Sequence, residues 1–219
     1  MKDKRVIEYL KKYNIVPKDF CERFQYLIGF LKLTLKDIEE VQKRIKKICN
    51  MNWNQVGFTI YMEPTATPRP RMVFKSRRTY VPNAKNNNDL FREFKDKCMS
   101  DIEPIVTPCK INIKAYFPIP STMTKVEKVL AELGFIPHIS KPDWDNLGKT
   151  YSDMIQPHIL VDDSLIYESH ITKLYSFKPR IEIDIRYMEK FDCKFNRKKV
   201  ESWKTIQEYK EMIDDRMEE

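Results

Sequence analysis

The sequence predicts an α+β fold in which helices cover one face of a mixed or antiparallel sheet. Near the end of the chain, Ile181, Ile183 and Ile185 alternate with charged residues, which indicates a strand with one buried and one solvated face. Elsewhere, apolar residues recur every three or four positions, as they do in amphipathic helices. Helices that bury such stripes on one face of a sheet form an α+β domain. We expect added helices at both ends of the chain.

Residues 1–55 are predicted to form a helical N-terminal extension. Thr34 and Asp37 have the spacing of a helix N-terminal cap at the start of its second apolar stripe. The other face of that helix is basic, and we interpret it as solvated surface in preference to a DNA contact. The stripes are Phe20, Phe24, Leu27, Ile28 and Leu31, then Ile38, Val41, Ile45 and Ile48, and the basic residues are Lys43, Arg44, Lys46 and Lys47.

The region 56–189 is predicted to be the main domain, opening with a strand at 56–62. A loop from Glu63 to Asn88 follows, with several prolines and no acidic residue after Glu63. Clustered basic side chains on a loop stiffened by proline can follow the phosphates of a nucleic acid. We interpret Phe74 and Tyr80 as anchors of this loop on the core. The basic residues predicted to bind nucleic acid are Arg69, Arg71, Lys75, Arg77, Arg78 and Lys85.

Further helices and strands are expected along the rest of the main domain. Asp145 or Asn146 is predicted to be the N-cap of a helix. The last two strands are predicted to pair antiparallel across a turn at Lys178 and Pro179. Residues 190–219 have the pattern of a basic linker and an amphipathic helix that packs on the chain or supports a dimer. The other predicted helices are 84–101 and 123–133, and the other strands are 109–117, 165–175 and 180–187.

The composition favours a polyanionic partner. The 219 residues carry a formal net charge of +8, and the pI is about 9.1. The five cysteines and three histidines are scattered without the spacing of a zinc site. No stretch has the length and apolarity of a membrane span, and the charged start leads into no signal-peptide core. We therefore expect a cytoplasmic protein.

One short stretch gathers acidic residues in an otherwise basic chain. Asp143 and Asp145 follow Pro142, and an extended backbone there would direct both carboxylates to one face. Helical pitch would then stack Asp145, Lys149 and Asp153. Carboxylates of this kind hold Mg²⁺, which activates a water and neutralises a phosphate, and a nearby lysine can stabilise the charge that develops. The stretch therefore predicts metal-dependent phosphodiester chemistry.

Other interpretations compete with a metal site. Lys149 and Asp153, taken alone, are better explained as a solvated ion-pair ladder. A calcium-binding loop is rejected because Leu147 and Met154 would occupy positions that need oxygen ligands. The later pair Asp162-Asp163, taken alone, is typical of a turn after the apolar run 159–161.

The acidic residues taken together resemble the RusA family of Holliday-junction resolvases, which are phage-related, Mg²⁺-dependent endonucleases. Lys173 in the following strand and the Arg- and Pro-rich segment 68–71 extend the resemblance, which covers about Val56 to Met188. The motif consists of Asp143, Asp145, Asn146, Leu147, Lys149, Asp153, Asp162 and Asp163.

The resemblance implies a role for each matching residue. Catalytic roles fall on Asp143, Asp145, Asp163 and Lys149. The three aspartates would also hold the metal, and Asp162 would assist them. Lys173 joins the predicted DNA contacts, whereas Gly148 and Trp144 receive no role.

The resemblance also implies cofactor, partners and activity. We expect Mg²⁺, with Mn²⁺ as a substitute, a homodimer, and resolution of four-way junctions in DNA recombination and repair. For a phage enzyme the site of action is the host cytoplasm. Two alternatives stay open, which are a nuclease for forks, flaps or other branched replication intermediates, and a DNA-binding accessory protein that does not cleave.

Overall fold

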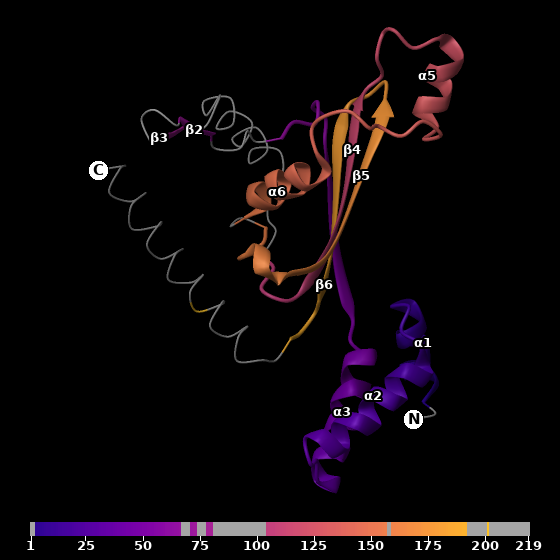
Figure 1. The fold of residues 1–219 in the computed structure, drawn as a ribbon, viewed down its shortest axis with the longest axis vertical. Coiled ribbons are helices and arrows are strands. Elements are labelled where there is room, and N and C mark those ends of the chain that lie inside the picture. The colour runs from indigo at the N-terminus through magenta and orange to yellow at the C-terminus, as the bar shows by residue number, and fades with distance from the viewer. Residues whose placement is uncertain are drawn as a thin grey trace. The chain divides into compact units, whose positions relative to one another are not determined.

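The computed structural model describes residues 3–66, 104–156 and 159–191, the backbone of 71–73 and 78–80, and Glu201. The chain divides into two compact units, residues 1–52 and residues 53–219 (Figure 1). Within the described residues, we find no helix with both the length and the apolarity that crossing a bilayer requires. Each unit is described by itself.

The first unit consists of helices, as predicted. Thr34 and Asp37 form the expected capping box: the Asp37 carboxylate accepts a hydrogen bond from Thr34 N at 2.9 Å, and Thr34 Oγ1 accepts one from Asp37 N at 3.3 Å. Val6 and Leu10 are buried, whereas no residue of the two longer helices is fully buried. The helices are α1 (Lys4–Lys12), α2 (Pro17–Phe30) and α3 (Leu35–Cys49).

The second unit is built on a mixed four-stranded sheet, which confirms the predicted α+β class. Its strands follow the order β1-β6-β4-β5. β6 is antiparallel to both of its neighbours, whereas β4 and β5 are parallel. The strands are β1 (Trp53–Ile60), β4 (Cys109–Pro118), β5 (Ile166–Ser176) and β6 (Arg180–Met188).

The predicted antiparallel pairing of the last two strands is wrong, because β4 lies between β5 and β6. Adjacent strands are about 4.8 Å apart, so the connection at 177–179 must step sideways by about 10 Å. Three extended residues span about that distance. A short connection therefore need not form a hairpin between the strands that it joins.

The sheet has one buried and one polar face, as the alternation in β6 predicts. Ile181, Ile183 and Ile185 are fully buried, whereas Asp184 between them accepts a hydrogen bond from Gln55 Nε2 at 2.6 Å. Helix α6 (Trp144–Ile155) lies across the buried face (Figure 1). Its largest fully buried side chains are Leu147, Tyr151 and Ile155.

The segment after β1 is not the uninterrupted loop that the sequence predicts. β2 (Arg71–Val73) and β3 (Arg78–Tyr80) pair antiparallel within it. Each strand has only three residues, which is too short for alternation to stand out in the sequence. The predicted helix at 84–101 lies outside the described residues, as does the C-terminal helix apart from Glu201, which is helical.

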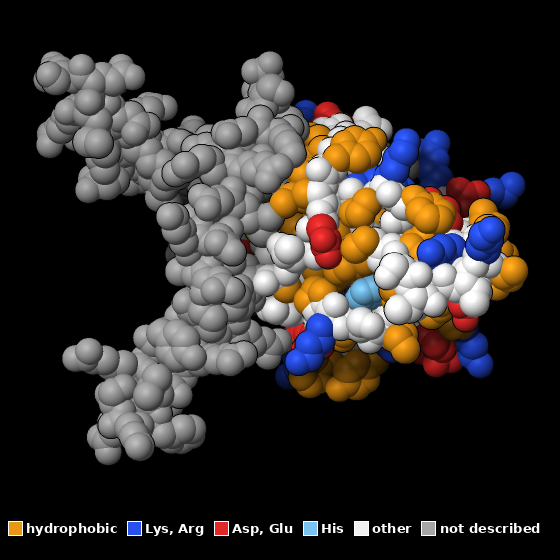
Figure 2. Space-filling model, turned by 90° about the horizontal axis from the view of Figure 1, so that it is seen from above, with side chains coloured by type: hydrophobic (Ala, Val, Ile, Leu, Met, Phe, Trp, Pro, Cys, Tyr) orange, Lys and Arg blue, Asp and Glu red, His pale blue; other side chains and the backbone are white. Residues whose placement is uncertain are grey.

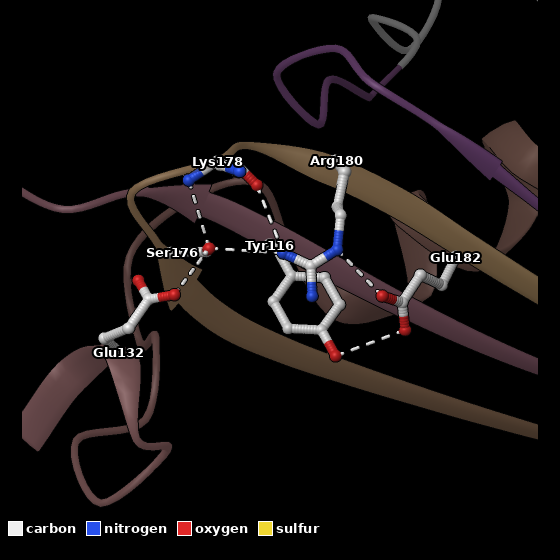
Figure 3. Close-up of polar contacts among 6 residues, drawn as sticks. All are labelled: Tyr116, Glu132, Ser176, Lys178, Arg180 and Glu182. Atoms are coloured by element: carbon white, nitrogen blue, oxygen red, sulfur yellow. Dashed lines mark hydrogen bonds and ion pairs between the residues drawn. The ribbon is translucent and has the colours of Figure 1, made fainter.

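Helix α5 (Lys125–Glu132) confirms the predicted helix at 123–133 and is tied to the connection after β5. The Glu132 carboxylate accepts a hydrogen bond from Ser176 Oγ at 3.1 Å (Figure 3). It accepts another from Phe177 N at 2.6 Å. Arg180 lies 3.6 Å from the Tyr116 ring centroid and donates to the Glu182 carboxylate at 2.8 Å. These contacts hold the crossing from β5 to β6.

The end of the molecule that carries α5 exposes apolar side chains. In the view from above, orange side chains lie between blue and red ones in broken patches (Figure 2). Val126 is 70% exposed on α5, Phe135 is 74% exposed just beyond it, and Phe177 is 64% exposed in the β5 to β6 connection.

The inward face of β5 holds the segment that leads into α6. The His138 ring stacks on Phe117, with centroids 3.9 Å apart, and lies 4.9 Å from the Tyr175 ring. His138 N also donates to the carbonyl of Lys173 at 3.4 Å. Two strands of the sheet therefore fix the residues before the acidic motif.

Gly148 brings α6 close to the same strand. A Cβ at this position would lie 2.3 Å from Ile171 Cδ1, well inside the normal contact distance. Gly148 is buried, and Lys149 follows it on the exposed side of the helix. A larger residue here would move the helix or the isoleucine.

We predict that the effect of Gly148→Ala depends on Ile171. Overpacking against Ile171 should cost about 1 to 3 kcal/mol, against about 1 kcal/mol gained when alanine replaces a helical glycine. The Ile171→Val background lacks Cδ1, so there the exchange should stabilise the protein. Urea unfolding of the four proteins measures this coupling, and equal effects in both backgrounds would contradict the close approach.

A second prediction concerns His138. Desolvation, followed by the Lys173 charge, lowers the pKa of His138 below its ordinary 6.5, and within the described residues its buried Nδ1 has no hydrogen-bond partner. Below pH 6.5 the unfolded chain binds a proton at this histidine more readily than the folded protein does. The free energy of unfolding is therefore highest above pH 6.5 and falls as the pH drops from 6.5 through the lowered pKa of His138.

His138→Phe keeps an aromatic ring in the stack but removes this titration. The variant should therefore gain stability relative to the unmodified protein as the pH falls below 6.5, by at most about 1.4 kcal/mol per pH unit. Urea unfolding at several pH values between 5 and 8 measures the difference. A difference that stays constant with pH would show that His138 titrates normally in the fold.

Candidate active site

The acidic motif lies at the start of α6. The helix begins at Trp144, and its first backbone hydrogen bond joins Leu147 N to Asp143 O at 3.1 Å. Asp143 is therefore the N-cap residue and Asp145 lies in the first turn, so the predicted cap at Asp145 or Asn146 is wrong. The expectation that an extended backbone aligns Asp143 with Asp145 also fails, because the chain is already helical at Trp144. Carboxylates at a helix N-terminus are favoured by the exposed N–H groups there.

Helix α6 separates its reactive side chains from its buried ones. Asp145, Lys149 and Asp153 are exposed and follow one another at intervals of four residues, which places them on one side of the helix. Leu147 and Tyr151 are buried on the other side. The exposed side thus presents two carboxylates and one ammonium to solvent, where a substrate can reach them.

The second acidic pair follows a buried run that crosses beneath the surface. Ile159 O accepts a hydrogen bond from Ile105 N at 2.8 Å, and Val161 N donates to Ile105 O at 3.2 Å. These bonds carry the chain to the 3-10 turn η1 (Asp163–Leu165), which Asp162 caps by accepting from Ser164 N at 2.8 Å. One oxygen of Asp162 therefore has a structural task, whereas Asp163 is exposed.

The pKa of Asp153 responds to charges on both α6 and η1. Desolvation raises the pKa of Asp153, Lys149 opposes that change, and the charge of Asp163 raises the pKa further. Asp153 is thus influenced by a lysine of its own helix and by a carboxylate of η1. Clustered like charges of this kind are frequent at functional sites.

Lys173 lies beneath the start of the motif. Its ammonium donates to the carbonyl of Pro142 at 2.8 Å and also to the carbonyl of Ser140. The contacts that the structure gives this predicted DNA-binding residue are thus to the protein backbone. The other predicted contacts are not placed: Arg69, Lys75, Arg77 and Lys85 lie outside the described residues, and only the backbone is described for Arg71 and Arg78.

The described residues include no group of three or more His, Cys, Asp or Glu side chains already arranged around a metal position. The donor chemistry nevertheless fits Mg²⁺, because this ion prefers oxygen and is held by one or two carboxylates, with waters and substrate phosphates filling the other positions. Asp143, Asp145 and Asp163 are exposed carboxylates that can serve in this way.

Sequence reasoning missed two features of the site. Gly148 was given no role, yet it permits the close approach of α6 to β5, and a glycine inside a helical pattern is a usable signal of such contact. Asp153 belongs to the matched motif but received no catalytic or metal role, whereas desolvation raises its pKa and the charge of Asp163 on η1 adds to that rise. That effect of Asp163 depends on the path of residues 159–161, which the spacing does not reveal.

Comparison with known proteins assigns the chain to a family. The sequence model of the family described as Endodeoxyribonuclease RusA matches residues 62–186, which include α6, η1 and the strands beneath them. The chain is also 31% identical over 136 residues to the Uncharacterized protein YqaN of Bacillus subtilis (strain 168), across 60% of this chain and 95% of YqaN. The first unit lies outside the family match. This chain belongs to the RusA endodeoxyribonuclease family.

Proposed function

We propose that this protein is a Mg²⁺-dependent endonuclease that resolves four-way DNA junctions during recombination and repair. The observation that carries the proposal is the exposed face of α6, on which Asp145, Lys149 and Asp153 follow one another at intervals of about one helical turn. This face presents acidic residues and a lysine to solvent, and desolvation together with the charge of Asp163 on η1 raises the pKa of Asp153. All these residues lie within the matched family region.

In this proposal the carboxylates of Asp143, Asp145 and Asp163 hold Mg²⁺, and Asp162 assists them. The bound ion supplies a water of lowered pKa and neutralises charge on the phosphate. Lys149 is placed one helical turn after Asp145, where its ammonium stabilises negative charge on the phosphoryl group or the leaving oxygen. Exposure of these side chains leaves room for a DNA backbone to approach.

The proposed substrate needs two further features of the protein. A four-way junction is resolved by two symmetric nicks, so a homodimer with two-fold symmetry would supply two equivalent sites. The basic residues between 69 and 85 would hold the phosphates on either side of the junction centre. Mn²⁺ would replace Mg²⁺, because both ions accept carboxylate and water ligands.

Substitutions at the site should slow cleavage strongly and spare the fold. We expect Lys149→Ala to slow junction cleavage about 10²- to 10³-fold, as the loss of one group that stabilises the transition state does, and Asp145→Asn to cause at least as large a loss. The matched control is Asp184→Asn, which changes an aspartate on the opposite face of the sheet and should leave the rate unchanged. Cleavage of end-labelled four-way junctions with Mg²⁺, and with chelator, gives the rates.

Parallel reactions with forks, flaps and linear duplex test the choice of substrate. We expect the four-way junction to be cut fastest. Faster cleavage of forks or flaps would assign the protein to branched replication intermediates instead. Tight junction binding with no Mg²⁺-dependent cleavage by the unmodified protein would contradict a nuclease, and full activity of Asp145→Asn would contradict the site.

A further inference from the structure

Three inward-facing residues of β5 hold the segment 138–148 at three successive points. Tyr175 lies beside the His138 ring, and Ile171 lies against the position of Gly148. Between them, Lys173 donates from its ammonium to two backbone carbonyls. Two of the three contacts are apolar or aromatic, but the central one places a charged group against the backbone.

We propose that Lys173 is a positioning residue for Asp143 and not a contact to DNA. By holding the carbonyls of Ser140 and Pro142, its ammonium fixes the backbone that enters α6, and with it the direction of the Asp143 carboxylate. The inference rests on the proposed metal-dependent cleavage, because only that function requires Asp143 to point in one direction.

Planarity of the peptide bond connects the lysine to the aspartate. The Pro142 carbonyl and the Asp143 N–H and Cα belong to one rigid plane, so a hydrogen bond to that carbonyl orients the start of Asp143. The next peptide plane is held by the bond from Leu147 N to Asp143 O at 3.1 Å. Both planes that flank Asp143 are therefore fixed, and only side-chain rotation remains.

The placement of Lys173 differs from that of a phosphate-binding lysine. Its side chain is half-buried on the face of β5 that also carries Ile171 and Tyr175. An ammonium has three donors, and two of them point to the backbone of the 138–143 segment. Groups that orient a metal ligand in this way usually change metal affinity or activity 10- to 100-fold when they are removed.

Four variants separate positioning from DNA binding. Lys173→Met keeps the length of the side chain and removes its donors, and Lys173→Arg restores donors. Lys178→Met is the matched control, because Lys178 is an exposed lysine in the connection that follows the same strand. If Lys173→Met does not fold, Lys173→Gln, whose side chain is shorter and uncharged, takes its place. Thermal unfolding establishes which variants are folded.

Three measurements are made on each folded variant. Electron paramagnetic resonance with Mn²⁺ gives the metal dissociation constant. Junction binding in chelator at several salt concentrations gives the slope of log K against log salt, and hydrogen exchange reports on the amides of residues 141–145.

For Lys173→Met we expect Mn²⁺ binding to weaken about 10- to 100-fold, exchange at residues 141–145 to accelerate, and the salt slope to stay unchanged. Lys173→Arg should recover most of the Mn²⁺ affinity, and Lys178→Met should match the unmodified protein in Mn²⁺ affinity and exchange.

The opposite pattern would overturn the inference. Unchanged Mn²⁺ affinity in Lys173→Met, together with a salt slope reduced by about 1, would make Lys173 a phosphate contact. Failure of the proposed function has a different signature, since the unmodified protein would then neither bind Mn²⁺ nor cut a junction. In that case hydrogen exchange decides the question. Faster exchange in Lys173→Met supports the inference that Lys173 fixes residues 141–145, and unchanged exchange overturns it.

Discussion

The attachment of one chain segment to the inward face of β5 is the constraint on which the candidate site depends. In the described sheet β5 is the outermost strand beside β4, and its inward-facing side chains hold a loop and a helix. These side chains are Ile171, Lys173 and Tyr175, and each contacts a different part of the segment 138–148. Because a strand repeats every two residues, the three contacts lie in line and set both the entry and the depth of α6.

This attachment has a chemical consequence at the opposite side of the helix. With Leu147 and Tyr151 buried, Asp145, Lys149 and Asp153 face outward, and the buried run 159–161 brings Asp163 near them. Carboxylates that repel one another are held together by the fold, while Lys149 offsets part of the repulsion. Such an arrangement is suited to a cation and a phosphate, which together supply the missing opposite charges.

The sequence predicts the helices and strands better than it predicts which of them lie side by side. Period-two alternation correctly shows which face of β6 is buried, but it contains no information on which strand lies beside it, so the pairing of β5 with β6 was predicted wrongly. Aspartate suits both the cap and the first turn of a helix, which explains the misplaced start of α6. The motif can be recognised in the sequence, whereas the partners of Lys173 and Gly148 arise only from long-range packing.

The central claim is that the start of α6 and the turn η1 supply carboxylates to one metal ion. A crystal structure of the unmodified protein grown with Mn²⁺, with anomalous scattering used to locate the ion, tests this claim most directly. We expect one strong peak shared by the carboxylate of Asp163 and by at least one of Asp143 and Asp145. Mn²⁺ bound to only one of the two segments, or elsewhere on the protein, would contradict the site.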